Sequence, residues 1–370
     1  MEALGRYQGV SSTSSEWDAW FNQPKSAGWD GATELDEVVS RFHQRVVSFR
    51  LDHPDFAEAV VDDPEKLPVS AASLRLCKPK LQQRLANLHH EMTYSDLHGS
   101  VSVAVRAKLL SNRQAGAGAV YDAIPSSKHL TASNEVFRLF SSRYQCITVL
   151  DTHHADCVCG VTAGGARPVS VTHEEYCPLG GGTADRHDAA VYEVAEMLRG
   201  SNFPTRIQCE ARGSEEQYPD LEVSNFPHPG ATALIELSVV CPTQERLVRA
   251  AAQQALSAAD FREEEKLRKY AQLAAARGDA IYPAVWESTG ANGRTLRRII
   301  NICAGTISSA QFAETALERT WAAATFTQYW TQRLAISFWR GSLQMANARS
   351  RAAAVRLEAA RTRPISQELF

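Results

Sequence analysis

The feature that most constrains the fold is an apolar run with one carboxylate at its centre. Residues 233–240 are Ala-Leu-Ile-Glu-Leu-Ser-Val-Val, a length and composition typical of a buried β-strand. An ionised carboxylate inside such a strand is costly unless a partner compensates its charge. Glu236 therefore requires a cation or a basic side chain nearby.

A second carboxylate lies on the preceding predicted strand. Pro219-Asp220 opens that strand, and residues 225–230, rich in Pro and Gly, form the turn that leads to the strand of Glu236. Side chains alternate along strands, so antiparallel pairing can bring Asp220 and Glu236 close together. Two ionised carboxylates repel unless a divalent cation lies between them. Oxygen ligands in an incomplete set suit Mg²⁺, so the pair predicts a Mg²⁺ (or Mn²⁺) site.

The helix predicted after this strand supplies basic side chains. Lys266, Lys269 and Tyr270 are at positions i, i+3 and i+4 and therefore share one face, which Arg262 extends by one turn. A metal held by the carboxylates can activate water for attack on a phosphate. A lysine on this face can orient that water or offset charge in the transition state.

The elements around these residues follow the order α-β-β-β-α-β, which places the chain in the α/β class. The first helix opens at Arg186-His187-Asp188 and is expected to be capped by Thr183 or Asp185. The elements are expected at 186–198, 205–211, 219–224, 231–241, 244–276 and 280–286.

A cluster of cysteines and a histidine precedes this core and predicts a zinc site. Cys157 and Cys159 are expected on one tight turn, and His173 and Cys177 follow at a spacing that one helical turn can present. Thiolate and imidazole are the ligands that select Zn²⁺, and four protein ligands indicate a structural site. His153, His154 and Asp156 are rival ligands, and the alternative interpretation is unrelated buried cysteines.

The remaining regions are expected to be largely helical. We expect a loose segment over 1–33, a helical linker region over 34–150, a zinc knuckle over 151–182, the α/β core over 183–303 and a C-terminal helical region over 304–370. Helices are expected at 35–51, 81–92, 101–110 and 134–144. The glycine-alanine stretch at 111–119 predicts a helix end and turn in preference to a phosphate-binding loop, because no strand precedes it.

The charge is distributed unevenly along the chain. From residue 241 onward there are 18 Lys/Arg and 11 Asp/Glu, a net charge of +7, so the total of −3 leaves −10 for residues 1–240. A basic second half is compatible with nucleic-acid contact. Aromatic and arginine side chains alternate over 304–362, and they either stack on nucleic acid or pack against the core. No apolar run of eighteen residues and no secretory signal is found, so we expect no membrane partner.

Taken together, these motifs resemble the restriction-like endonuclease of site-specific non-LTR retrotransposons, a branch of the PD-(D/E)xK nuclease superfamily. The resemblance covers roughly residues 75–345. In that family a Cys-Cys-His-Cys knuckle lies upstream of the nuclease. The matching residues are Cys157, Cys159, His173, Cys177, Arg186-His187-Asp188, Pro219-Asp220, Glu236, Lys266-x-x-Lys269-Tyr270 and, as the final strand and turn, residues 282–290.

The resemblance implies a PD-(D/E)xK restriction-endonuclease-like fold with helical extensions, and a metal-dependent endonuclease that nicks DNA. Asp220 and Glu236 would bind the metal, Lys266 or Lys269 would be the catalytic lysine, and Tyr270 would support it. The parent superfamily has its lysine two residues after the strand carboxylate, where this chain has Ser238. Second-rank candidates for the edge of the site are Arg186, Glu193 and Glu210.

The same resemblance implies partners and a location. It implies DNA, or alternatively RNA, as the partner, and a nuclear or nucleocytoplasmic location. The reverse transcriptase that precedes the nuclease in that family is missing from this sequence. The second hypothesis is therefore a zinc-containing module that binds nucleic acid or a protein and has lost cleavage. These two hypotheses differ in whether Asp220 and Glu236 are needed for activity.

Overall fold

The computed structural model describes Ser40, Gln44 and residues 81–146, 156–162, 165–168, 175–177, 179, 181–207, 219–309, 311–312 and 320–362. The chain divides into two compact units, Met1–Ser100 and Val101–Phe370. This boundary falls inside the region 34–150 that the sequence predicts as a helical linker. The predicted helix at 35–51 lies outside the described residues except for Ser40 and Gln44, both of which are helical.

In the first unit, helix α5 spans Leu81–Ser100, further than the predicted end at residue 92. The second unit begins with three short helices, α6 (Val103–Asn112), α7 (Ala119–Asp122) and α8 (Asn134–Tyr144). Serine side chains cap two of them: Ser102 accepts from the amide of Val105 at 3.4 Å, and Ser133 accepts from that of Val136 at 3.3 Å. Such caps satisfy amides that the first helical turn leaves open.

The glycine-alanine stretch between α6 and α7 forms the predicted turn. Gly116 has a φ of +93°, and a Cβ atom added to it would lie 2.6 Å from the side chain of Asn292. The amide of Asn292 donates to the carbonyl of Ala115 at 2.8 Å. Glycine is required here by both the backbone conformation and the close approach of the loop at Asn292.

The centre of the second unit is a four-stranded sheet with the order β3-β4-β5-β6. Strands β3 (Thr205–Ile207), β4 (Leu221–Ser224) and β5 (Thr232–Val240) pair antiparallel, and β6 (Ala280–Glu287) pairs parallel to β5. The parallel connection runs through α10 (Val248–Ala251) and α11 (Ser257–Arg277). With α9 (Gly182–Gly200) before β3, the chain order is the predicted α-β-β-β-α-β with one additional short helix.

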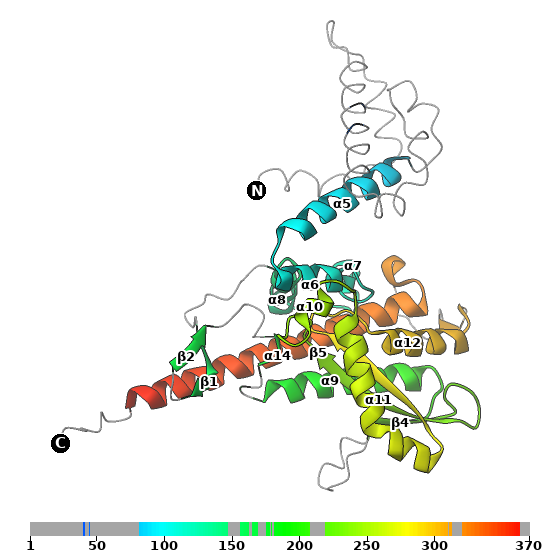
Figure 1. The fold of residues 1–370 in the computed structure, drawn as a ribbon. Helices are drawn as coiled ribbons and strands as arrows, with labels where there is room; N and C mark the ends of the chain where they lie inside the picture. The colour runs from blue at the N-terminus through cyan, green and yellow to red at the C-terminus, as the bar shows by residue number, and fades with distance from the viewer. Residues whose placement is uncertain are drawn as a thin grey trace, which may run out of the picture. The chain divides into compact units, whose positions relative to one another are not determined.

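Alternation along β5 assigns the two faces of the sheet. Ala233, Ile235 and Leu237 belong to the main hydrophobic core, which also contains buried residues of α9, α12 (Arg294–Thr306) and α14 (Phe326–Thr362). Val240 belongs to a second core with Ala258 and Ala259 of α11. Helices α10 and α11 therefore pack on one side of the sheet, with the second core, and α9, α12 and α14 pack on the other side, with the main core (Figure 1).

Two expectations about helix boundaries are wrong. The helix predicted over 244–276 is broken, because Leu256 adopts a φ of +63° and is buried in the core between α10 and α11. Helix α9 is capped by neither Thr183 nor Asp185. It begins after Gly181, which has a φ of +73° and makes no side-chain cap.

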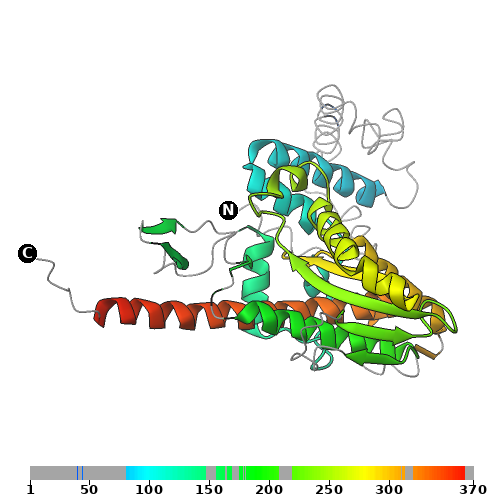
Figure 2. The ribbon, with the colours of Figure 1, turned by 60° about the horizontal axis from the view of Figure 1, so that its bottom comes forward.

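Helix α14 runs beside α9, as both views of the ribbon show (Figure 2). Its aromatic side chains Trp330, Phe338 and Trp339 are buried in the main core. For these residues the interpretation that the C-terminal aromatics pack against the core is confirmed. Trp321, in the 3₁₀ turn η4 (Trp321–Ala323), is 86% exposed. No helix in the described ranges has both the length and the apolar composition needed to cross a membrane.

Candidate functional site

The candidate site lies on the α11 face of the sheet and begins with Asp220, immediately before β4. One carboxylate oxygen, Oδ2, accepts a hydrogen bond from the amide of Leu237 in β5 at 2.7 Å. The β4–β5 register pairs Leu221 with Ile235, and one further step places Asp220 opposite Glu236. Residues opposite each other in an antiparallel pair point to the same face. The predicted approach of the two carboxylates is therefore what the strand pairing produces.

Glu236 occupies the middle of β5 and is only 5% exposed. Burial raises the pKa of its carboxyl group, and the negative charge of Asp220 raises it further. The ammonium group of Lys266 and a hydrogen bond from Tyr270 act in the opposite direction. Ionised Glu236 thus depends on cationic or hydrogen-bonding neighbours, as expected for a carboxylate in a buried strand.

Helix α11 supplies those neighbours from one face. Lys266 forms an ion pair with Oε1 of Glu236, and both side chains are nearly buried. Tyr270 is 4% exposed, and its pKa is raised by burial and by the charge of Glu236. The ammonium group of Lys269 lies 4.7 Å from the centre of the Tyr270 ring. Burial and the charge of Lys266 lower the pKa of Lys269.

Four of the predicted residues are therefore brought together by direct contacts: Glu236, Lys266, Lys269 and Tyr270. Asp220 completes the group from the neighbouring strand. Of the two lysines, Lys266 contacts the carboxylate of Glu236, whereas Lys269 contacts the ring of Tyr270. The geometry therefore favours Lys266 as the lysine that acts with the carboxylates. Lys269 is separated from Glu236 by the side chain of Tyr270.

His187 of α9 belongs to the site but was not among the predicted site residues. Its Nε2 lies 3.2 Å from Oδ2 of Asp220, and its Nδ1 lies 3.1 Å from Asp188. Burial lowers the pKa of His187, but the hydrogen bonds and charges of Asp220 and Asp188 outweigh burial and raise the pKa to about 9. The imidazolium form of His187 therefore holds the Asp220 carboxylate. The motif Arg186-His187-Asp188 was the sequence feature that could have identified His187 as a site residue.

Arg186, predicted at the edge of the site, points elsewhere. Its side chain is 4% exposed, donates to the carbonyl of Glu175 at 3.2 Å and lies over the ring of Phe338 at 5.7 Å. A Cβ atom on Gly341 of α14 would come within 2.9 Å of the Arg186 Cα. Arg186 therefore faces α14 and not the carboxylates. Adjacent residues on a helix point about 100° apart, so Arg186 cannot point the same way as His187, which contacts Asp220.

The other second-rank candidates do not join the site either. Glu193 forms an ion pair with Arg333 of α14, whose guanidinium lies 4.4 Å from the centre of the Trp330 ring. This pair links α9 to α14. Glu210 lies outside the described residues.

The predicted zinc ligands are only partly described. Cys157 and Cys159 lie in strand β1 (Asp156–Thr162), which pairs antiparallel with β2 (Gly165–Pro168), so the expected tight turn is wrong. The side chains of both cysteines and all of His173 lie outside the described part.

Cys177 is described and is 1% exposed, in a small apolar cluster with Leu179 against Ala352 and Ala353. Glu175, two residues earlier, is equally buried. It forms an ion pair with Lys108 of α6 and accepts a hydrogen bond from Ser288 at 2.6 Å. The C-terminal end of the predicted knuckle is thus anchored to the sheet unit by a buried charge pair.

The oxygen atoms around Asp220 and Glu236 form a donor set that can be compared with the ligands that a divalent cation requires. In the described part of the chain no three His, Cys, Asp or Glu side chains gather in a metal-binding group. Two carboxylates can nonetheless hold Mg²⁺, which keeps several waters and takes further oxygens from phosphate. Ser238, on the same strand face as Glu236, has a buried Oγ without a hydrogen-bond partner among the described residues. The donor set is therefore rich in oxygen and suits a partly hydrated Mg²⁺.

Comparisons with known proteins add no assignment: no protein-family model matches the chain, and no curated protein is similar to it.

Proposed function

We propose that the protein is a metal-dependent DNA endonuclease with a PD-(D/E)xK-like core, and that it nicks one strand. The observation that carries the proposal is the meeting of Asp220 and Glu236 on one face of adjacent strands, with Lys266 of α11 against Glu236. A buried acidic pair with an adjacent lysine is suited to binding a divalent cation beside a phosphodiester.

Each residue has a defined role in this proposal. Asp220 and Glu236 would hold Mg²⁺, which when bound would lower the pKa of a water and offset negative charge on the phosphate. His187 and the amide of Leu237 fix the orientation of Asp220. Lys266, which is paired with Glu236 in this structure, would be free to orient the attacking water once the cation compensates Glu236. In the hydrolysis the water oxygen bonds to phosphorus as the bond to the leaving oxygen breaks; the water gives up a proton to solvent and the leaving oxygen takes one up from solvent.

The test is a nicking assay on supercoiled plasmid with Mg²⁺ or Mn²⁺. Asp220→Asn and Glu236→Gln are expected to lower the rate by about 100-fold or more, since each removes one charge of the cation site. Glu222→Gln is the matched control. Glu222 lies two residues after Asp220 and therefore on the same face of the strand, but its carboxylate is paired with Arg277 at 2.6 Å and not with the site. It is expected to stay within about threefold of wild type. If wild type and Asp220→Asn nick the plasmid at the same background rate, the proposal is wrong.

One observation favours a second candidate, a nucleic-acid binding module without cleavage. The position two residues after Glu236 is Ser238, and Lys266 already neutralises Glu236 through an ion pair. For this candidate the Asp220→Asn variant binds DNA as wild type does, and neither protein cuts it. Binding that weakens with salt in both proteins would identify it.

The proposal retains a structural zinc ion held by Cys157, Cys159, His173 and Cys177. Thiolate and imidazole ligands in a set of four support this assignment. Elemental analysis of the purified protein is expected to give one zinc per chain, and Cys177→Ser is expected to reduce that content. A wild-type protein without zinc would remove this part of the proposal.

A further inference from the structure

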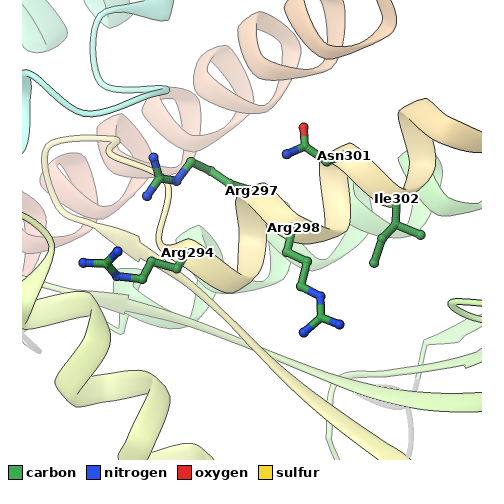
Figure 3. Close-up of a pocket in the computed structure, with 5 residues that line it drawn as sticks. All are labelled: Arg294, Arg297, Arg298, Asn301 and Ile302. Atoms are coloured by element: carbon green, nitrogen blue, oxygen red, sulfur yellow. The ribbon is translucent and has the colours of Figure 1, made fainter.

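The exposed side of α12 carries three arginines around an open pocket. The pocket has a volume of about 560 Å³. It is lined by Arg294, Arg297, Arg298, Asn301 and Ile302, as Figure 3 shows. The arginines fall at i, i+3 and i+4, so a single helical turn presents all three. In the close-up, the guanidinium groups of Arg294 and Arg297 extend toward the same side of the helix, and Arg298 extends from its adjacent side.

Among the residues that the structure describes, two of these arginines have no carboxylate partner. Arg294 is ion-paired with Asp260 of α11 at 2.8 Å. Arg297 and Arg298 form no ion pair with any residue in the described ranges. The guanidinium of Arg298 lies 5.6 Å from the centre of the Tyr282 ring, which orients it without neutralising it. The surface therefore retains two positive charges that are available to an anion.

The position of these charges is unfavourable within the protein itself. All three arginines lie in the first five residues of α12, where the helix dipole is positive and disfavours cations. Glu263 of α11 offsets the helix end by accepting from the amide and hydroxyl of Thr295, at 3.1 and 2.7 Å. That carboxylate binds the cap residue Thr295, and among the three arginines its charge acts on Arg294. An external anion would relieve the remaining repulsion.

Two contacts link this surface to the elements that carry the candidate site. Glu263, which caps α12, is one helical turn from Lys266 on α11. Tyr282, whose ring lies under Arg298, belongs to the main core on the other face of the sheet, and the next residue of β6, Pro283, is paired with Glu236. Helix α12 therefore lies beside the strand that neighbours the one carrying the carboxylate.

We propose that Arg297 and Arg298 bind the phosphodiester backbone of duplex DNA that extends past the edge of β6 from the candidate site. This inference rests on the proposed function, because it names the surface that holds the substrate of that site. Guanidinium groups match the geometry of phosphate oxygens, and a row of them suits a polyanion. Phosphate contacts position DNA and carry no sequence information.

The test is the affinity of the whole chain for a labelled 30-base-pair duplex, measured in EDTA at several salt concentrations. Arg297→Gln with Arg298→Gln is expected to weaken binding about tenfold or more at 0.1 M salt. It should also reduce the slope of log K against log salt by about 1.8, the value for two lost phosphate contacts. Replacing both by lysine retains the charges and is expected to keep most of the slope.

A matched pair of substitutions controls for net charge. Arg249→Gln with Arg268→Gln removes two charges from exposed arginines of α10 and α11 and is expected to change affinity by less than about threefold. Equal losses in the two glutamine pairs, or no loss in the α12 pair, would overturn the inference. Because EDTA stops cleavage, this outcome is separate from the nicking assay: a protein that nicks but ignores the α12 substitutions disproves only this inference.

Discussion

At the scale of single residues, the balance of charge around Glu236 decides what the site can bind. The carboxylate is buried next to Asp220, and Lys266 and Tyr270 compensate it from α11. Removing one partner of a buried ion pair leaves an uncompensated charge, which costs more than the pair itself contributes. A divalent cation can take over the compensating role of the lysine.

The two lysines can be distinguished by substitution with methionine. Lys266→Met is expected to lower the free energy of unfolding by on the order of 3 kcal/mol without metal, because Glu236 loses its ion pair. Lys269→Met, at an exposed position, is expected to cost less than about 0.5 kcal/mol. Mg²⁺ should then raise the melting temperature more in Lys266→Met than in wild type. A smaller Mg²⁺ effect in that variant would show that the cation does not replace the lysine at Glu236.

His187 gives the site a pH-dependent contribution to stability. Its pKa is raised from 6.5 to about 9 in the fold, so protonation is favoured by folding. The stabilisation is fully present below about pH 6.5 and is lost as the pH rises through 9. In EDTA, the difference in denaturation midpoint between wild type and His187→Gln is therefore expected to shrink between pH 6 and pH 9.5. A difference independent of pH would contradict the pairing of His187 with Asp220.

At the scale of elements, the contact between α9 and α14 depends on glycines that allow close approach. A Cβ atom on Gly341 would lie 2.9 Å from the Arg186 Cα, and one on Gly182 would lie 2.5 Å from the Met345 Cα. Both clashes are with backbone atoms, which cannot rotate away. The two helices can therefore adopt this spacing only with glycine at these positions.

Gly341→Ala is accordingly expected to destabilise the fold by about 1–3 kcal/mol, as overpacking does in other cores. Gly305→Ala in α12 is the control, because a Cβ atom there meets nothing within 4 Å. In a helix that substitution is expected to stabilise by about 0.5–1 kcal/mol. Thermal or chemical denaturation measures both, and a neutral Gly341→Ala would mean that the helices are less closely packed.

Local patterns in the sequence predicted much of this architecture. The apolar run around Glu236 indicated β5, and the turn at 225–230 indicated its antiparallel pairing with β4. What sequence patterns could not give were contacts between distant elements. The motif at Arg186 led to the prediction that it lies at the edge of the site and gave no sign that α14 covers it, and the pairing of Glu193 with Arg333 spans 140 residues. The break at Leu256 is likewise imposed by packing, since leucine favours helix.

The same limit applies to the candidate site. Asp220 and Glu236 could be found because one short turn separates their strands. Lys266 and Tyr270 followed from helical spacing on the next element. His187 was missed because its contact with Asp220 depends on how α9 lies against the sheet, which no local pattern encodes.

At the scale of the whole molecule, the described cores draw only on the second unit. The buried clusters around the sheet contain residues from Ala107 onward, and the boundary between the units falls at Ser100. A fragment of residues 101–370 is therefore expected to fold, with cooperative thermal unfolding by circular dichroism, and to nick plasmid at a rate within about threefold of the full chain. A fragment that fails to fold would show that the first unit completes the core.

The sheet ends at β6, an edge strand with Pro283 in its middle. A proline inside a paired edge strand is tolerated where its nitrogen faces away from the neighbouring strand. A strand from a second molecule that approached this edge would find one amide donor missing from the row it needs. The proline thus discourages the addition of a foreign strand to β6 and protects this edge, one strand away from Glu236, against aggregation.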